Sequence, residues 1–165
     1  MKDDTQGQIA DCLILPTSVR TQIVDHLHNS LPNEGVGLLA VEWVNKEEQR
    51  LAVTRHFYPG INFLASPTRF EMDRHQLIAA LRDIDQHDWS LGAIVHSHPR
   101  GPATPSPTDL AEANYPESLM MIASFATNSP DLRAWRLDAG SAGWEPRQVP
   151  ILENTEDAIA DKNCS

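Results

Sequence analysis

The sequence predicts a mixed α/β (α+β) fold in which one sheet is flanked by helices. Segments with helical spacing of apolar residues alternate along the chain with short apolar runs that are typical of strands. The size, 165 residues and 18.3 kDa, is that of one domain. The composition, 41% apolar and 22% charged residues, is typical of a globular chain. We therefore expect one domain over residues 12–152, with disordered polar tails at 1–11 and 153–165.

Two segments carry apolar residues at helical spacing. Val19, Ile23 and Leu27 recur every four residues and predict an amphipathic helix over 17–29. Asp73, a residue type that caps helices, precedes the second segment. The residues expected to share the buried face of this second helix are Leu77, Ile78, Leu81 and Ile84.

Several apolar or β-branched runs are typical of strands. They are 36–44, 50–58, 91–95, 119–125 and 131–137. The polar segment between the first two runs predicts that they form a hairpin. The third run leads directly into His96 and His98. Periodicity does not predict the order of the strands in the sheet.

Charge and cysteine content narrow the functional class. The chain has 23 acidic and 13 basic residues, a formal charge of −10 and a pI of about 5.0. Nucleic acids and anionic membranes would repel this net charge. Cys12 and Cys164 are too few for a disulfide scaffold, and Asp3 and Asp4 stand where a signal peptide would be basic. We expect a soluble cytoplasmic protein that binds neither nucleic acid nor membrane.

The strongest chemical signal is His96-Ser97-His98 followed by Asp109. Histidines at positions i and i+2 of an extended strand point to the same face, so their imidazoles can meet at one metal ion. The proline-rich loop after His98 can bring Asp109 back to complete a set of two histidines and one aspartate. Zinc accepts such ligands and keeps a fourth position for water, whose pKa falls to about 7 on the metal.

Glu34 and Ser106 are candidates for the remaining catalytic groups. Glu34 stands just before an apolar strand and can act as general base on the water, while the Ser106 hydroxyl can stabilise an oxyanion. Structural alternatives stay open. Ser106 and Asp109 match a helix capping box, in which Asp109 would bind the Ser106 N–H and no metal. The histidine pair can equally be a packing feature, and Glu34 a solvated loop carboxylate.

Together these residues resemble the signature of the JAMM/MPN+ metalloproteases. The likeness is carried by Glu34, His96-Ser97-His98-Pro99 and Ser106-x-x-Asp109. It extends to 31–39 and 69–73 and covers residues 13–149. The resemblance implies a single domain with a cytidine-deaminase-like mixed sheet, and one Zn²⁺ ion held by His96, His98 and Asp109. It also implies Glu34 as general acid/base and Ser106 as oxyanion stabiliser.

The chain is similar to the compact bacterial and archaeal members of that family, because it has no room for the insertions with which eukaryotic deubiquitinases hold ubiquitin. The resemblance implies a ubiquitin-like or sulfur-carrier protein as substrate, cut at a peptide or isopeptide bond after Gly-Gly. A narrow channel beside a sheet edge admits an extended backbone most easily where side chains are absent. Prokaryotic members commonly carry Ala-Cys where this chain has Gly35-Val36, which we interpret as a packing variation.

Other interpretations stay open. The same ligand set can hold iron(II) in a non-heme enzyme, which metal analysis distinguishes. The chain can also be a non-catalytic MPN-type scaffold that acts through protein contacts. A similar His-x-His-Pro loop occurs in the RadC-like branch linked to DNA repair, which lacks the Glu-x-x-Gly-Leu-Leu strand of this chain. The sequence does not determine which carrier protein is cut or the oligomeric state.

Overall fold

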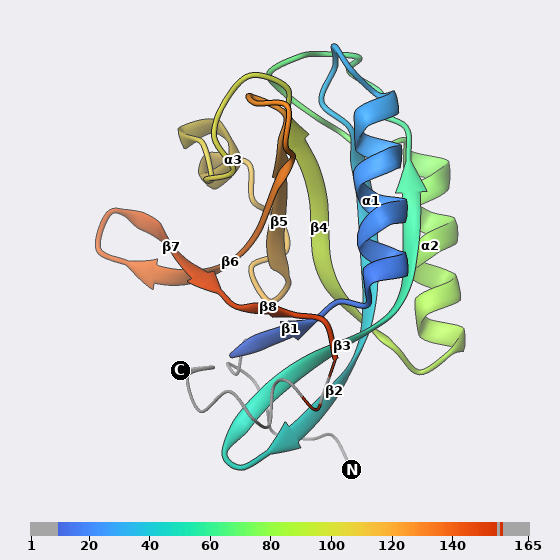
Figure 1. Cartoon of the computed structure of the whole chain (residues 1–165), viewed down its shortest axis with the longest axis vertical. Helices are drawn as coiled ribbons and strands as arrows, with labels where there is room; N and C mark the ends of the chain where they lie inside the picture. The colour runs from blue at the N-terminus through green and yellow to red at the C-terminus, as the bar shows by residue number, and fades with distance from the viewer. Residues whose placement is uncertain (1–9, 155, 157–165) are drawn as a thin grey trace.

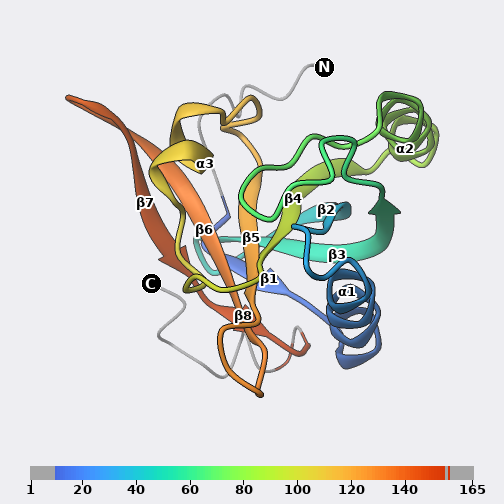
Figure 2. The same cartoon turned by 90° about the horizontal axis from the view of Figure 1, so that it is seen from above.

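The protein folds as a strongly curved sheet with helices on both faces (Figures 1 and 2). The structure is a computed structural model that describes residues 10–154 and 156. In this part of the chain eight strands form one sheet in the order β7-β6-β5-β4-β2-β3-β1-β8. The elements are β1 (Cys12–Ile14), α1 (Thr17–Asn29), β2 (Val36–Lys46), β3 (Gln49–Gly60), α2 (Arg74–Gln86), β4 (Ser90–His98), α3 (Pro107–Ala111), β5 (Leu119–Ser124), β6 (Asp131–Gly140), β7 (Gly143–Val149) and β8 (Ile151–Leu152). The predicted mixed α/β class is confirmed.

Helix α1 covers one face of the sheet and has the predicted bounds. Ile23 and Leu27 are fully buried and pack in the main core with Leu39 and Val95 of the sheet. A spacing of four residues places both side chains on one side of the helix. Apolar periodicity therefore predicted this helix correctly.

Helix α2 covers the opposite face of the sheet, as the view from above shows (Figure 2). Leu77 and Leu81 pack in a cluster with Leu38 of β2, whereas the next strand residue, Leu39, packs under α1. Successive side chains of a strand point to opposite faces. Both faces at the centre of the sheet are therefore buried, which explains the continuous apolar run in the sequence.

The capping of α2 was predicted correctly, but one residue of its buried face was not. Asp73 caps the helix, since its Oδ2 accepts the Gln76 N–H at 3.1 Å. Ile78 is 42% exposed, so its predicted place on the buried face was wrong. Ala80 lies on that face instead. Residues 77, 80, 81 and 84 share one side of a helix, whereas the residue after 77 is rotated by about 100°.

The hairpin of β2 and β3 is confirmed and is longer than predicted. The two strands pair antiparallel up to Lys46 and Gln49. Glu47 and Glu48 alone form the turn, with φ values of 48° and 66°. These are the two positive values that a tight type I′ turn requires. The polar residues before the turn also belong to the strand. They are exposed, because this end of the hairpin projects into solvent.

Strand β4 is the central element for the site. It pairs antiparallel with β2 and parallel with β5. The strand continues past the predicted 91–95 run, so His96 and His98 both lie on it. The predicted runs 119–125 and 131–137 correspond to β5 and β6.

The sequence did not predict β1, β7 and β8. Strands β1 and β8 have three and two residues, which is too short for a recognisable period, and they pair with each other in parallel. Strand β7 is exposed along most of its length and therefore lacks an apolar alternation. These strands form the two ends of the sheet order.

Most of the predicted tails, and with them Cys164, lie outside the described residues. Within the described residues Ala10 is fully buried, and Asp11 Oδ2 accepts the Arg50 N–H at 2.8 Å. These two residues therefore pack on the sheet. No helix in the described part of the chain is both long enough and apolar enough to cross a bilayer.

Candidate metal centre

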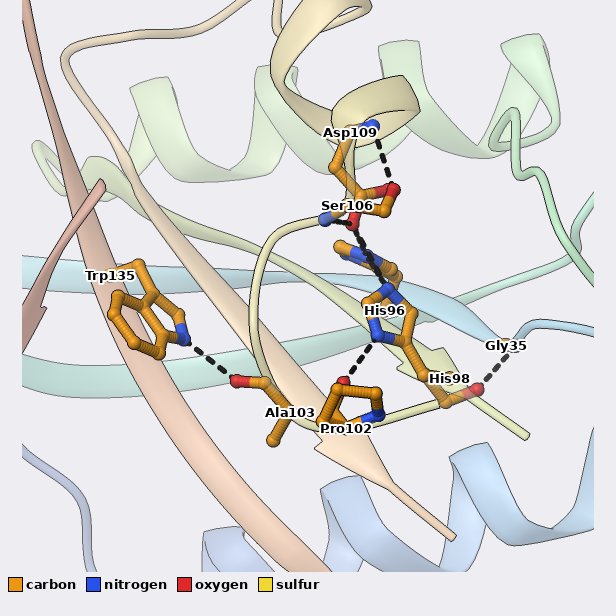
Figure 3. Close-up of polar contacts among 9 residues, drawn as sticks. Gly35, His96, His98, Pro102, Ala103, Ser106, Asp109 and Trp135 are labelled. Atoms are coloured by element: carbon orange, nitrogen blue, oxygen red, sulfur yellow. Dashed lines mark hydrogen bonds and ion pairs between the residues drawn. The ribbon is translucent and has the colours of Figure 1, made fainter. Parts of the chain in front are cut away.

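Three side chains from two elements converge at the end of β4 (Figure 3). His96 and His98 are alternate residues at the end of the strand, and Asp109 lies in the first turn of α3. The two Nε2 atoms are 3.2 Å apart. Asp109 Oδ2 is 3.0 Å from His98 Nε2 and 3.2 Å from His96 Nε2. The structure thus brings together the three residues that the sequence predicted as metal ligands.

The spacing of these three atoms fits a small divalent cation. Two ligands that are each about 2.0 Å from a tetrahedral zinc ion lie roughly 3.3 Å apart. The three separations here, 3.0 to 3.2 Å, are close to that value. Two imidazole nitrogens and a carboxylate oxygen are also donors that zinc accepts. The residues present therefore fit the metal that the resemblance implies.

The loop between β4 and α3 is fixed to its surroundings. His98 Nδ1 lies 2.7 Å from the Pro102 carbonyl oxygen, to which it can donate. The Trp135 indole N–H donates to the Ala103 carbonyl at 2.8 Å (Figure 3). The Ser124 hydroxyl donates to the carbonyl of Gly101, in the same loop, at 2.6 Å. With its proton on Nδ1, a neutral His98 ring would offer the Nε2 lone pair to a metal ion, whereas in the metal-free protein Nε2 can carry a proton and donate it to Asp109 Oδ2 at 3.0 Å. The loop therefore sets the orientation of the ring as well as its position.

Asp109 takes part in the capping box and faces the histidines at the same time. The Ser106 N–H donates to Asp109 Oδ2 at 2.9 Å, and the Asp109 N–H donates to Ser106 Oγ at 3.0 Å. The capping box suggested by the sequence is therefore present, and it does not prevent the same carboxylate from facing the two candidate histidine ligands. Burial would raise the pKa of Asp109, but hydrogen bonds with His96, His98 and the Ser106 N–H hold it well below its usual range. Asp109 is therefore an anion in the folded protein.

The two histidines have different surroundings. His96 is completely buried, and its ring stacks on Phe70 with centroids 4.4 Å apart. Burial lowers the pKa of His96, which favours the neutral ring that a metal requires. Its Nδ1 has no hydrogen-bond partner among the described residues. Burial also opposes protonation of His98, but Asp109 and the Pro102 carbonyl outweigh it and raise the pKa of that ring.

Glu34 lies beside this centre as a buried carboxyl. Glu34 lies in the segment just before β2, and it is only 3% exposed. Oε2 has no hydrogen-bond partner among the described residues. Burial, together with the negative charge of Asp109, raises the pKa of Glu34 to about 7. Glu34 is therefore not the solvated loop carboxylate of the structural alternative, and it can gain and lose a proton near neutral pH.

Ser97 connects the Glu34 segment to the ligand strand, a role that the sequence analysis missed. The Gly35 N–H donates to Ser97 Oγ at 2.8 Å, and the Ser97 N–H donates to the Gly35 carbonyl at 3.2 Å. Because Ser97 lies between the two histidines on a strand, its side chain must point away from theirs. The alternation of side chains along the strand was therefore a signal in the sequence that Ser97 faces away from the two histidines. The residue after the acid/base candidate is thus tied to the strand that carries both histidines.

A groove of about 650 Å³ runs to Asp109 between α2 and α3. The β3–α2 loop contributes Leu64, Arg69 and Phe70 to its wall, and the chain at and after the end of α3 contributes Glu112. Arg69 forms an ion pair with Glu112, so the two sides of the groove are in contact. The apolar floor includes residues of β2, β4 and β5. The groove therefore reaches the candidate ligand Asp109, while His96 and His98 are not among its lining residues.

Residues 16–138 match the model of the family described as prokaryotic homologs of the JAB domain. Among curated proteins, the chain is 36% identical over 104 residues to a probable TtuB-protein conjugate cleaving protease of Thermus thermophilus. That match spans 62% of this chain and 64% of the relative. The chain is also 28% identical over 141 residues to the CysO-cysteine peptidases of Mycobacterium tuberculosis and Mycobacterium bovis, spanning 83% of this chain and 90% of theirs.

Two solved structures show the same fold. A protein of Desulfitobacterium hafniense superposes with a TM-score of 0.70 and 26% identity, over 86% of this chain and 94% of its own. A protein of Salinibacter ruber superposes with a TM-score of 0.61 and 24% identity, over 86% and 91%. The fold and the family match agree over the segment that carries the site.

Proposed function

This chain belongs to the family of prokaryotic homologs of the JAB domain, and on that basis we propose that it is a zinc-dependent peptidase acting on conjugates or extensions of a sulfur-carrier protein. The observation that carries the proposal is the convergence of His96, His98 and Asp109 beside the buried carboxyl of Glu34. A site with three protein ligands keeps a position for water, unlike a structural zinc site with four.

His96, His98 and Asp109 would hold the ion through Nε2, Nε2 and Oδ2, the atoms that converge in the structure. When bound, zinc supplies a Lewis acid that makes water acidic near neutral pH. The same three donors also suit iron(II), so the identity of the metal is part of the proposal.

Glu34 is proposed to move the proton of the reaction. In its ionised form it accepts a proton from the attacking water, and it then donates that proton to the leaving nitrogen. In the metal-free protein the pKa of this carboxyl is raised to about 7, which supports a role that needs both protonation states near neutral pH. Its burial beside the ligands keeps it near the reacting atoms.

Ser106 is proposed to stabilise the oxyanion. Its Oγ accepts the Asp109 N–H, which fixes the position of the hydroxyl in the capping box. The hydroxyl proton can then be directed to the substrate carbonyl oxygen as negative charge develops there. Ser106 thus combines a structural and a chemical role.

The groove is proposed to hold the extended C-terminal tail of the carrier protein. Its volume of about 650 Å³ and its apolar floor suit a short extended peptide that leads to Asp109. The names of the relatives, a TtuB-protein conjugate cleaving protease and a CysO-cysteine peptidase, support a carrier-protein substrate. A Gly-Gly end would pass most easily between the two sides of the groove at the metal.

The test is incubation of the wild-type chain with a ubiquitin-like sulfur-carrier protein that has residues beyond its Gly-Gly end, read by intact mass. We expect a product that ends at Gly-Gly, and no product after the metal is chelated. A carrier in which Gly-Gly is replaced by Ala-Ala is the matched control and should remain uncut. Cleavage that persists in chelator would contradict metal dependence, and absence of any cleavage by metal-loaded protein would contradict the proposed substrate class.

A further inference from the structure

The loop between β3 and α2, residues 61–73, is organised around the side chain of Asn62. The Asn62 amide donates to the carbonyls of Glu34 and Arg69, each at 3.0 Å. Its Oδ1 accepts the N–H of Leu64 at 3.2 Å and that of Glu71 at 3.0 Å. A side-chain amide offers two donors and two acceptor positions. All four are used here, and one of them reaches outside the loop to Glu34.

The backbone of the loop closes on itself around this side chain. Asn62 and Met72 form an antiparallel bridge. Next to it, the Phe63 N–H donates to the Glu71 carbonyl at 2.7 Å, and the Asp73 N–H donates to the Ile61 carbonyl at 2.8 Å. The loop is therefore a closed unit that can act as one body on what it contacts.

This loop holds both main-chain polar groups of Glu34. The Glu34 N–H donates to the Ser66 carbonyl at 2.8 Å, and the Glu34 carbonyl accepts the Asn62 amide. Ser97 holds the following residue, Gly35, from the other side. The backbone of Glu34 is thus fixed between the loop and the strand that carries the histidines.

The same loop forms a wall of the groove. Leu64, Arg69 and Phe70 line the groove, and Phe70 stacks on the ring of His96. Asn62 bonds directly to the main chain of two of these lining residues, Leu64 and Arg69. One amide therefore connects the wall that a substrate would touch to the backbone of the acid/base candidate.

We propose that Asn62 is a positioning residue, which fixes the carboxyl of Glu34 relative to the groove and the metal ligands through the Glu34 carbonyl. The expected effect of Asn62 on catalysis rests on the proposed function. The structural coupling between Asn62 and Glu34 does not rest on it. Aspartate has nearly the same shape as asparagine but lacks the two N–H donors. Asn62→Asp therefore keeps the acceptor for Leu64 and Glu71 and removes the donors to Glu34 and Arg69.

The first experiment measures amide hydrogen exchange by NMR in the metal-free protein. In Asn62→Asp we expect the Glu34 amide to exchange about tenfold faster than in the wild type, because its segment loses an anchor. The amide of Ser97, which bonds to Gly35, is the internal reference and should be unchanged. Unchanged exchange at Glu34 in both Asn62→Asp and Asn62→Ala would overturn the coupling. This experiment needs neither substrate nor metal.

The second experiment measures turnover of the carrier substrate. Asn62→Asp should lower kcat about 10- to 100-fold with unchanged metal content, because a displaced catalytic group loses much of its effect. Asp73→Ala is the matched control: it removes the side-chain cap of α2 at the end of the same loop, keeps the Asp73 N–H that bonds to Ile61, and does not contact Glu34, so it should leave kcat unchanged. In a Glu34→Gln background, Asn62→Asp should cause no further loss of the residual turnover.

A loss that is fully additive with Glu34→Gln, or a rise in KM with kcat unchanged, would show that Asn62 merely shapes the groove. Either result would overturn the positioning role. If the wild-type protein cuts no carrier, the proposed function fails, while the exchange experiment still decides whether Asn62 holds Glu34.

Discussion

The two sides of the site are built differently. The ligand side, with His96, His98 and Asp109, lies on a strand end and a capped helix turn whose polar groups bond to one another and to the loop between them. The acid/base side, with Glu34 and residues 61–73, has little regular structure and is held by backbone hydrogen bonds together with one asparagine side chain that bonds to four backbone groups. It also exposes apolar side chains, such as Phe63 at 70%.

This difference matches the roles proposed for each side. A ligand set works best when its geometry is fixed before the metal binds. The proposed general base must change its protonation state, and the proposed groove wall must admit a substrate. Substitutions on the two sides should therefore have separable effects.

Removing a ligand should have the largest effect. His98→Ala should reduce turnover to the limit of detection and remove the metal, because two donors rarely retain zinc. His87→Ala is the control, since that histidine is exposed and stacks on Trp89 away from the site. Full activity in a metal-depleted His98→Ala protein would contradict the assignment of the ligand side.

Changing the proposed general base should leave the metal content unchanged. Glu34→Gln keeps the shape of the side chain but removes its ability to accept a proton, so we expect kcat to fall about 10²- to 10⁴-fold at normal metal content. Elemental analysis and steady-state kinetics on the same preparation provide the measurement. An undiminished kcat would remove Glu34 from the mechanism.

Ser106→Ala tests the oxyanion role. Losing one such donor lowers kcat by about 10²- to 10³-fold. The change also removes half of the capping box, which costs about 1 kcal/mol of stability. Ser106→Thr restores a hydroxyl and the cap, so it should recover part of both losses. If Ser106→Ala loses stability and keeps its kcat, then Ser106 only caps the helix.

The pKa of Glu34 predicts a pH effect on stability in the metal-free protein. The unfolded chain ionises Glu34 above about pH 4.5, whereas the folded protein keeps the proton until about pH 7. Glu34 therefore contributes stability that is complete below pH 4.5 and is lost as the pH rises to 7. Relative to Glu34→Gln, the wild type should lose roughly 3 kcal/mol over this interval, measured by urea unfolding. A gap that does not depend on pH would contradict the burial of this carboxyl.

The smallest effect concerns Gly35. This glycine stands where prokaryotic family members commonly carry alanine, and we interpreted the difference as a packing variation. A Cβ on Gly35 would lie 2.8 Å from Leu27 Cδ2 and from Ser30 Oγ, and 3.1 Å from Leu27 Cα. Gly35→Ala should therefore cost about 1–3 kcal/mol, because the backbone of α1 cannot move aside easily. Gly101→Ala, whose Cβ would meet nothing closer than 3.8 Å, is the control for thermal unfolding. Equal stability of the two variants would contradict the close packing of α1.

The sequence predicted the elements that carry strong periodicity or a capping residue. Helix α1 and the strands under it follow apolar spacing, and Asp73 marks the start of α2. The convergence of His96 and His98 was predictable because strand alternation places both side chains on one face. Such features depend on residues close together in the sequence.

The rest depends on contacts between distant segments. Strand β1 forms by pairing with β3 and β8, and β8 forms by pairing with β1, while two or three residues carry no period. Ile78 was misplaced because its hydrophobicity does not reveal that Ala80 points inward instead. The anchoring of Glu34 by Asn62 and the stacking of Phe70 on His96 join segments that periodicity cannot relate.

The proposed metal centre requires that His96, His98 and Asp109 together hold one zinc ion. Native mass spectrometry combined with elemental analysis of the purified wild-type chain measures this. We predict one zinc ion per chain, released by chelation and regained on adding zinc. A wild-type protein that binds no metal, or that holds iron in its place, would contradict the zinc assignment.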